Sequence, residues 1–228
     1  MAGAGAAASA LSSPWRALLQ RALDANGHAT SGTPPSSNSY VSIAFVPSSG
    51  LGKTRFAHNC RFVSGHGERR RQAGEPHRRV QEYSDKIQIN TDARSNKIGE
   101  IKSCPFGEIC WYFTDSWEQF RISGSIDVID ASSADPAKLQ HREKAWFSSS
   151  VKSRLQYLGP QPGILVLDDE HVKDVHLDQL AGPVDAFCLL VLDPEKVDYL
   201  NLKSNQRLMF TRQNGDGSND WMAVKVSP

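Results

Sequence analysis

Residues 86–101 read KIQINTDARSNKIGEI, and this stretch decides the fold. In its first half Ile87, Ile89 and Thr91 alternate with polar residues, as they do in a half-buried β-strand. From Arg94 onward the isoleucines are spaced as on the inward face of a helix that extends to Ser103. The stretch therefore predicts a strand that turns directly into a helix, with free backbone N–H groups at the first turn of that helix.

Further strands are predicted on both sides of this stretch. The apolar and alternating segments that indicate them are 40–45, 108–113, 119–129, 187–192, 196–202, 207–212 and 221–226. Helices are predicted over 14–26, 136–147 and 150–157. Because strands dominate and the helices are few, we expect a mainly β protein with peripheral helices, built as a closed or partly closed antiparallel barrel.

One internal segment, 46–82, departs from this pattern. It shows no helix or strand period, and GHGERRRQAGEPHRRVQ within it has five arginines and few residues to bury. Such a composition predicts disorder or a solvated loop. We therefore divide the chain into an N-terminal tail, helix and loop over 1–39 and a barrel domain over 40–228, with 46–82 atypical.

The overall composition excludes several classes of function. A formal net charge of +1 gives no general electrostatic basis for binding nucleic acid or a membrane surface. No apolar run reaches the roughly 20 residues that span a bilayer. The four cysteines form no C-x-x-C pair, which favours buried thiols in an intracellular protein. The compartment, whether cytoplasm, plastid or mitochondrion, is left open.

Three local motifs suggest other chemistry, and each is rejected on spacing. Residues 50–54, GLGKT, end like a phosphate-binding loop, but the position of its first glycine is Pro47. His58, Cys60 and His66 match no zinc pattern, so no metal site is expected. The arginines of 69–79 have no interleaved aromatic residues, so no nucleic-acid partner is expected.

A resemblance to a known family extends from Lys86 to Pro228. The strings that carry it follow one another in order: KIQINTDARSNKIGEI, CPFGEICWYF, WEQFRISG, KLQHREKAWF, SRLQYLGPQPG, PEKVDYLNLKSNQRLMF and a closing W-x-x-x-K-V-x-P. Together they are similar to the plant branch of the pyridoxamine 5'-phosphate oxidase family. The resemblance implies an FMN-binding split β-barrel that works as a homodimer, with FMN at the dimer interface.

The resemblance also implies which residues hold FMN. A dianionic phosphate on a polar chain needs cations and hydroxyl donors. The phosphate and ribityl end is assigned to Thr91, Asp92, Ser95, Asn96 and Lys97. Gln119 resembles the glutamine that contacts the flavin ring, and Arg207 matches an arginine that reaches FMN from the C-terminal part. Singly, each of these could be an ordinary solvated or ion-paired residue.

The substrate side of the site matches the family less closely. Where the family has an Arg-x-His pair, this chain has Lys203-Ser204-Asn205. Lysine can meet a phosphate, but without the bidentate fork of arginine. Lys203, Asn205 and Arg154 are the substrate candidates. Asn96 also replaces a basic residue of the family, and no catalytic acid or base is assigned, because the cofactor carries the chemistry.

One segment of the family's FMN site is missing from its expected place in the sequence. Members have, just before the strand at Ile87, a segment close to GRPANRTVVFRGF whose arginine grips the FMN phosphate. Here RQAGEPHRRVQ stands there. Codons for 73–81 can be chosen so that dropping one nucleotide gives PANRTVVF. We interpret the segment as this strand read out of frame, which predicts one disrupted barrel strand and poor stability. Sequencing the transcript decides the matter.

The resulting hypothesis is an FMN-dependent oxidase that converts pyridoxamine or pyridoxine 5'-phosphate to pyridoxal 5'-phosphate. Its partners are then a phosphorylated B6 vitamer, oxygen and a second copy of the chain. Two alternatives are kept: a non-catalytic or weakly flavin-binding member of the family, and an FMN oxidoreductase with another substrate.

Overall fold

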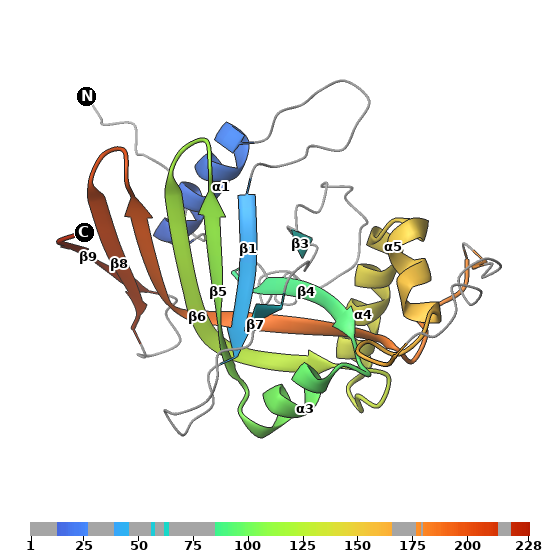
Figure 1. The fold of residues 1–228 in the computed structure, drawn as a ribbon. Coiled ribbons are helices and arrows are strands. Elements are labelled where there is room, and N and C mark those ends of the chain that lie inside the picture. Colours follow the sequence, from blue (N-terminus) through green and yellow to red (C-terminus); the bar gives the residue numbers. More distant parts are fainter. Residues whose placement is uncertain are drawn as a thin grey trace, which may run out of the picture.

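The computed structural model describes residues 13–26, 39–45, 56–57, 62–63, 85–165, 177–178, 180–213 and 220–228. One antiparallel sheet organises them (Figure 1). Its strands are β1 (Ser39–Phe45), β2 (Phe56–Ala57), β3 (Phe62–Val63), β4 (Ile87–Asp92), β5 (Phe106–Phe113), β6 (Glu118–Ile129), β7 (Phe187–Asn201), β8 (Gln206–Arg212) and β9 (Trp221–Val226). The spatial order is β2-β1-β5-β6-β7-β4-β3, with β8 beside β7 and β9 beside β8.

Strand β7 is the centre of this sheet. Along one edge it pairs with β6 from Leu189 to Asn201. Its other edge is divided: β4 pairs with Phe187–Leu192, and β8 pairs with Lys196–Asn201. A bulge separates the two halves, where Gly124 of β6 lies opposite Pro194. A Cβ atom at Gly124 would lie 1.9 Å from the carbonyl oxygen of Asp193, so only glycine fits this close approach.

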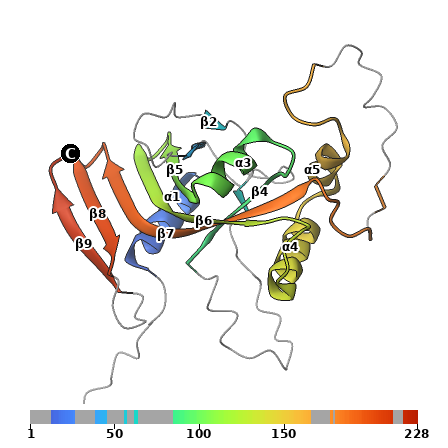
Figure 2. The same cartoon turned by 90° about the horizontal axis from the view of Figure 1, so that it is seen from below.

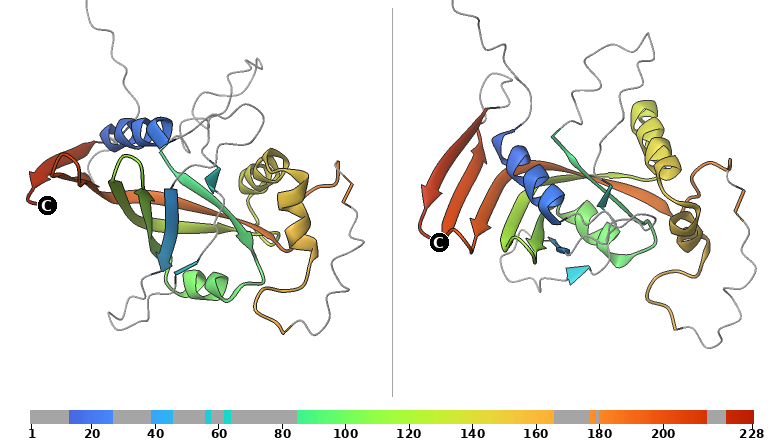
Figure 3. Two further views of the ribbon diagram at one scale, coloured as in Figure 1. Left: turned by 45° about the horizontal axis from the view of Figure 1, so that its top comes forward. Right: turned by 90° about the horizontal axis from the view of Figure 1, so that it is seen from above.

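Two helices cover opposite ends of the rolled part of the sheet (Figures 1 and 3). These are α1 (Pro14–Asn26) and α3 (Asn96–Ser103). Trp15, Leu19 and Ala22 of α1 are buried in the same cluster as Ile98 and Ile101 of α3. The inward-facing residues of β4, β5, β6 and β7 complete this cluster. The barrel interior is thus filled by side chains from both helices and from the sheet.

A second core covers the outer face of the sheet at one end of β7. Helices α4 (Pro136–Ser148) and α5 (Val151–Leu155) and the 3-10 helix η1 (Gln156–Leu158) lie there, at the end of β7 opposite β8 and β9 (Figure 2). Trp146 and Tyr157 pack against Phe187, with ring centroids 5.2 and 5.0 Å from it. The first half of β7 is therefore buried on both faces.

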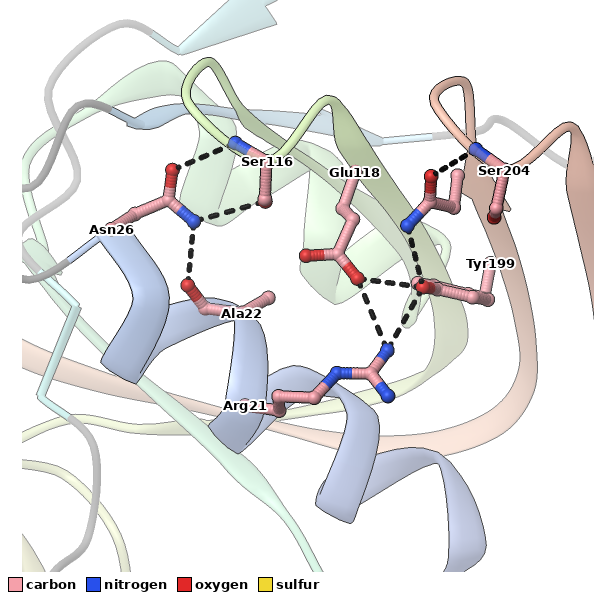
Figure 4. Close-up of polar contacts among 8 residues, drawn as sticks. Arg21, Ala22, Asn26, Ser116, Glu118, Tyr199 and Ser204 are labelled. Atoms are coloured by element: carbon pink, nitrogen blue, oxygen red, sulfur yellow. Dashed lines mark hydrogen bonds and ion pairs between the residues drawn. The ribbon is translucent and has the colours of Figure 1, made fainter.

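Polar contacts fasten α1 to the strand ends (Figure 4). The Tyr199 hydroxyl donates to the buried Glu118 carboxylate at 2.6 Å, and Arg21 donates to both at 3.1 and 3.3 Å. Asn26 accepts the backbone N–H groups of Asp115 and Ser116 and so caps the β5–β6 turn. The N-terminal helix is consequently tied to the sheet by hydrogen bonds as well as by apolar packing.

Several sequence predictions need correction. The strands expected over 187–192 and 196–202 are one strand, β7, which continues through Pro194. Pro194 lies at the register shift with β6, and bulges are positions where a strand tolerates proline. The helix expected from Arg94 begins at Asn96. Within 46–82, expected to contain no strand, Phe56–Ala57 and Phe62–Val63 pair with β1 and β4.

The mainly β architecture with peripheral helices is confirmed, and the sheet is rolled but not closed. The predicted disruption of a strand by the frame change falls outside the described residues. The boundary after residue 39 stays a prediction; α1, which precedes it, shares the core of the sheet.

Candidate functional site

A pocket of about 320 Å³ opens where β4 turns into α3. This volume lies at the lower end of the range for small-molecule sites, roughly 300–1,000 Å³. The β4–α3 turn forms one wall, and η1 with the loop after it forms the other. The lining residues are Asn90, Thr91, Asp92, Ser95, Lys97, Gln156, Tyr157 and Pro162.

The β4–α3 turn presents main-chain donors to this pocket. The Asp92 carbonyl accepts both the N–H of Ser95, at 3.2 Å, and its hydroxyl, at 2.8 Å, so the chain reverses within three residues. Ser95 is the N-cap of α3, and its side chain makes no capping hydrogen bond. Since the first amides of a helix have no intrahelical acceptor, this helix end carries a partial positive charge beside the pocket.

Thr91 and Lys97 are two pocket residues whose side chains remain available to an anionic ligand. Thr91 is 5% exposed and lies opposite Cys188 in the ladder between β4 and β7. Within the described part of the chain, neither its hydroxyl nor the Lys97 ammonium makes a hydrogen bond or an ion pair. A hydroxyl, an ammonium and free amides at a helix end suit an anion such as a phosphate.

Asp92 and Ser95 line the same pocket, but their polar groups already have partners. The Asp92 carboxylate accepts the Nε and Nη2 atoms of Arg94 at 3.0 and 2.7 Å. This hydrogen bonding raises the pKa of Arg94 above its ordinary value. Because the guanidinium neutralises the carboxylate, Asp92 does not present a free negative charge to an anion. Asn96 is exposed and does not line the pocket.

Gln119 and Arg207 lie together, but away from this pocket. Gln119 pairs with Leu200 of β7, and Leu200 pairs with Arg207 of β8, so the two polar side chains share one cross-strand row on the outer face of the sheet. Arg207 donates to Asp198 at 2.7 and 3.0 Å, and this bidentate pair raises the pKa of Arg207. The structure therefore separates the expected FMN residues into two groups.

The expected substrate residues do not gather at one place either. Lys203 and Asn205 lie in the β7–β8 turn, where the Lys203 ammonium donates to the carbonyl of Asp115 at 2.6 Å. Asn205 has φ 51°, a left-handed conformation that asparagine tolerates in turns. Arg154 is buried on α5 with its guanidinium 5.5 Å from the ring centroid of Trp146.

Sequence reasoning missed the second wall of the pocket. Gln156, Tyr157 and Pro162 belong to the string SRLQYLGPQPG, in which sequence reasoning gave a role to Arg154 alone. Its density of glycine and proline after a short helix indicates a loop with a fixed path. That signal was present, but nothing in the sequence showed that this loop meets the β4–α3 turn.

The described residues hold no group of three or more His, Cys, Asp or Glu side chains that could bind a metal. His58, Cys60 and His66, considered above, lie outside those residues. No described helix is both long and apolar enough to cross a membrane. Close to the pocket, burial raises the pKa of the Cys188 thiol to about 12, so this thiol is uncharged at neutral pH.

Comparison with known proteins places the chain in a family. Residues 12–130 match the family model described as the FMN-binding domain of pyridoxamine 5'-phosphate oxidase. The chain is also 47% identical over 216 residues to pyridoxine/pyridoxamine 5'-phosphate oxidase 2 of Arabidopsis thaliana, covering 94% of this chain and 97% of that protein. The chain belongs to the pyridoxamine 5'-phosphate oxidase family. The resemblance found from the sequence is confirmed.

Solved structures of related proteins agree with the fold. A pyridoxamine 5'-phosphate oxidase-related, FMN-binding protein from Nostoc punctiforme is 26% identical, with a TM-score of 0.74 over 95% of this chain and 98% of that one. PhzG from Burkholderia lata, 19% identical with a TM-score of 0.57 over 83% of this chain and 82% of its own, shares the fold. The architecture is thus the FMN-binding split barrel of this oxidase family.

Proposed function

We propose that this chain is an FMN-dependent oxidase that converts pyridoxamine or pyridoxine 5'-phosphate to pyridoxal 5'-phosphate. The observation that carries the proposal is the pocket at the β4–α3 turn, where Thr91 and Lys97 stand beside the free end of a helix in a chain of this family. The Arabidopsis relative supports the choice of substrate, since its name specifies pyridoxine and pyridoxamine 5'-phosphates.

The residues present fit the phosphate-bearing end of FMN. Lys97 supplies one full positive charge, and the N-terminus of α3 adds a partial one. Thr91 supplies a hydroxyl that can donate to a phosphate oxygen, and the pairing of Asp92 with Arg94 removes the repulsion that a free carboxylate would cause. Within the described chain the pocket offers a single ammonium, so we expect Lys97 to carry much of the affinity.

FMN, when bound, would supply the redox chemistry of hydride transfer and of re-oxidation by oxygen. The protein binds FMN and the substrate and orients them. Thr91 and Lys97 hold the phosphate end, and burial of Thr91 in the ladder with Cys188 fixes the position of its hydroxyl. Gln119 would then contact the flavin ring, and Arg207 would reach FMN from the C-terminal part of a chain.

The separation of these two groups supports a homodimer. Thr91 lies opposite Cys188 and Arg207 opposite Leu200, positions that are 12 apart (200 − 188) along β7. At about 3.3 Å per residue this is roughly 40 Å of strand, far more than one flavin spans. If both groups contact the same FMN, one copy contributes the Lys97 pocket and the other contributes Arg207 and Gln119.

Mixed dimers test this arrangement. We expect a Lys97→Ala copy and an Arg207→Ala copy each to be weak alone. Co-expressed with different affinity tags, they form heterodimers in which one site has lost both residues and the other is intact. Recovery of about half the flavin content supports the shared site. A monomer by light scattering, or no recovery in purified heterodimers, contradicts it.

The activity itself is tested on the purified full chain. We expect yellow protein with flavin absorbance, and release of peroxide with formation of pyridoxal 5'-phosphate when pyridoxamine 5'-phosphate is added. Flavin-loaded protein without such turnover would favour a second candidate, a flavin-binding member of the family that does not oxidise this substrate. The contact of Lys203 with the carbonyl of Asp115 favours that candidate, because this expected substrate-binding cation is already engaged.

A further inference from the structure

Arg94 joins the two walls of the pocket. It lies in the β4–α3 turn, where its Nε and Nη2 atoms bind the Asp92 carboxylate. From there the same guanidinium reaches the opposite wall: Nη1 donates to the carbonyl of Gly159 at 3.0 Å, and Nη2 lies 3.4 Å from the carbonyl of Tyr157. In the opposite direction, the side-chain amide of Gln161 donates a hydrogen bond to the carbonyl of Arg94 at 3.1 Å.

The far wall is anchored unequally along its length. Tyr157 is buried against Trp146 and Phe187, so the start of this wall is held by the second core. Residues 160–165 are exposed, yet Pro162 among them lines the pocket. The hydrogen bonds that we find between this loop and the β4–α3 turn, within the described residues, all involve Arg94.

Arginine suits this place for a geometric reason. Its planar fork can meet a carboxylate with two N–H groups and direct others elsewhere, whereas a lysine ammonium is a point charge on a flexible stem. Asp92 fixes the plane of the guanidinium, and the guanidinium then fixes the position of Gly159. A side chain that touches both walls can determine the width of the pocket without touching its ligand.

We propose that Arg94 is a positioning residue: it holds the Tyr157–Gln161 segment against the β4–α3 turn and so keeps the pocket at the width that the phosphate-bearing end of the cofactor requires. This inference rests on the proposed function for the identity of the ligand. The clamp itself depends on the contacts alone, so the two can be tested separately.

The experiment compares Arg94→Ala and Arg94→Lys with Lys102→Ala in the full chain. Lys102 is the matched control: it is also in the α3 region and also forms a charged hydrogen bond, to Asp130 at 2.9 Å, but it does not line the pocket. The first measurement is amide hydrogen exchange over 156–163 without added FMN. The second is the FMN dissociation constant from quenching of flavin fluorescence.

We expect exchange over 156–163 to be roughly tenfold faster in Arg94→Ala, and FMN to bind roughly tenfold more weakly, the loss of about one charge-assisted hydrogen bond. Arg94→Lys should resemble Arg94→Ala, because lysine keeps the charge but not the fork. Lys102→Ala should match the unmodified protein in both measurements. Gln161→Ala, at an exposed loop position, removes one contact and should show a smaller change in the same direction.

The outcomes separate the two ideas. Unchanged exchange over 156–163 in both Arg94→Ala and Gln161→Ala overturns the clamp, whatever FMN does. Full recovery of FMN affinity by Arg94→Lys also overturns it, since charge alone would then suffice. If the unmodified chain fails to bind FMN while Arg94→Ala still accelerates exchange, the proposed function fails and the clamp stands.

Discussion

The two halves of β7 use one strand in different ways. Its first half, paired with β4, is buried on both faces between the barrel core and the α4–α5 core, and the pocket lies at its start. Its second half, paired with β8, alternates buried and outward residues and carries Asp198 on the outer face. Beside the first half, Lys97 lines the pocket without an ion pair to any described residue, whereas in the second half Asp198 is paired with Arg207.

This difference in burial between the two halves of β7 indicates which half suits a ligand pocket. A half of the strand that is buried on both faces can hold a rigid pocket. A cation in such a pocket does not compete for its ligand with an acidic side chain of the protein. An outward half exposes its charges to solvent, so they form internal pairs until another molecule displaces them. The bulge at Gly124 is the boundary, and the predictions below act on each side of it.

The largest effect is expected at that boundary. In Gly124→Ala the new Cβ would collide with the Asp193 carbonyl, so the two halves cannot keep their positions. We expect the free energy of unfolding to fall by about 3 kcal/mol or more, as in severe overpacking. Urea denaturation measures it. Gly99→Ala is the control, because a Cβ there meets nothing within 4 Å. Equal stability of both variants would show that the bulge adapts.

The first half is tested through Lys97. Lys97→Ala removes the cation of the pocket, and FMN should bind roughly 10- to 100-fold more weakly, as for the loss of a charged hydrogen bond. Lys97→Arg should keep most of the affinity. Fluorescence titration with FMN measures both. An unchanged dissociation constant for Lys97→Ala would place the phosphate elsewhere.

The free energy of unfolding at alkaline pH tests one buried titratable group in each half of β7. Burial raises the pKa of Cys188 from 9.0 to about 12, and burial with the hydrogen bond to Glu118 raises that of Tyr199. The contribution of Cys188 to stability should therefore be constant below pH 9 and be lost between pH 9 and 12, because the unfolded thiol loses its proton first. One proton corresponds to a slope of about 1.4 kcal/mol per pH unit.

Two substitutions separate these contributions. Cys188→Ala should flatten the fall that begins at pH 9, and Tyr199→Phe should change only the part above pH 10. Urea midpoints across this pH range measure the slopes. A Cys188→Ala variant that keeps the full slope would assign it to other groups.

The smallest effect is expected on the second half. Asp198→Asn weakens the pair that holds Arg207, which must be released before it meets a flavin. Because exposed ion pairs are weak, FMN should bind only up to about fivefold more tightly. Arg207→Ala supplies the comparison and should bind more weakly. Identical titrations for both variants would remove Arg207 from the site.

The sequence predicted secondary-structure elements better than the tertiary contacts between them. Alternation and helical spacing located nearly every strand and helix, because burial on one face leaves a period that can be read directly. Pro194 hid the continuity of β7, since a proline ordinarily ends a central strand and the glycine that accommodates it is 70 positions away. In the same way, Thr91 and Lys97 were found from a local turn, but Gln156 and Pro162 reach the pocket only through tertiary contact.

The contact between Trp15 and Trp221 has a consequence for synthesis of the chain. Their rings lie edge to face, 6.0 Å apart, so the first helix packs against the last strand. A nascent chain cannot make this contact until Trp221 has left the ribosome. Until then Trp15 lacks its aromatic neighbour, and long-range contacts of this kind form late and slowly. Newly made chains should therefore keep Trp15 without this neighbour until β9 has left the ribosome, and truncation before Trp221 should expose the first helix to proteases.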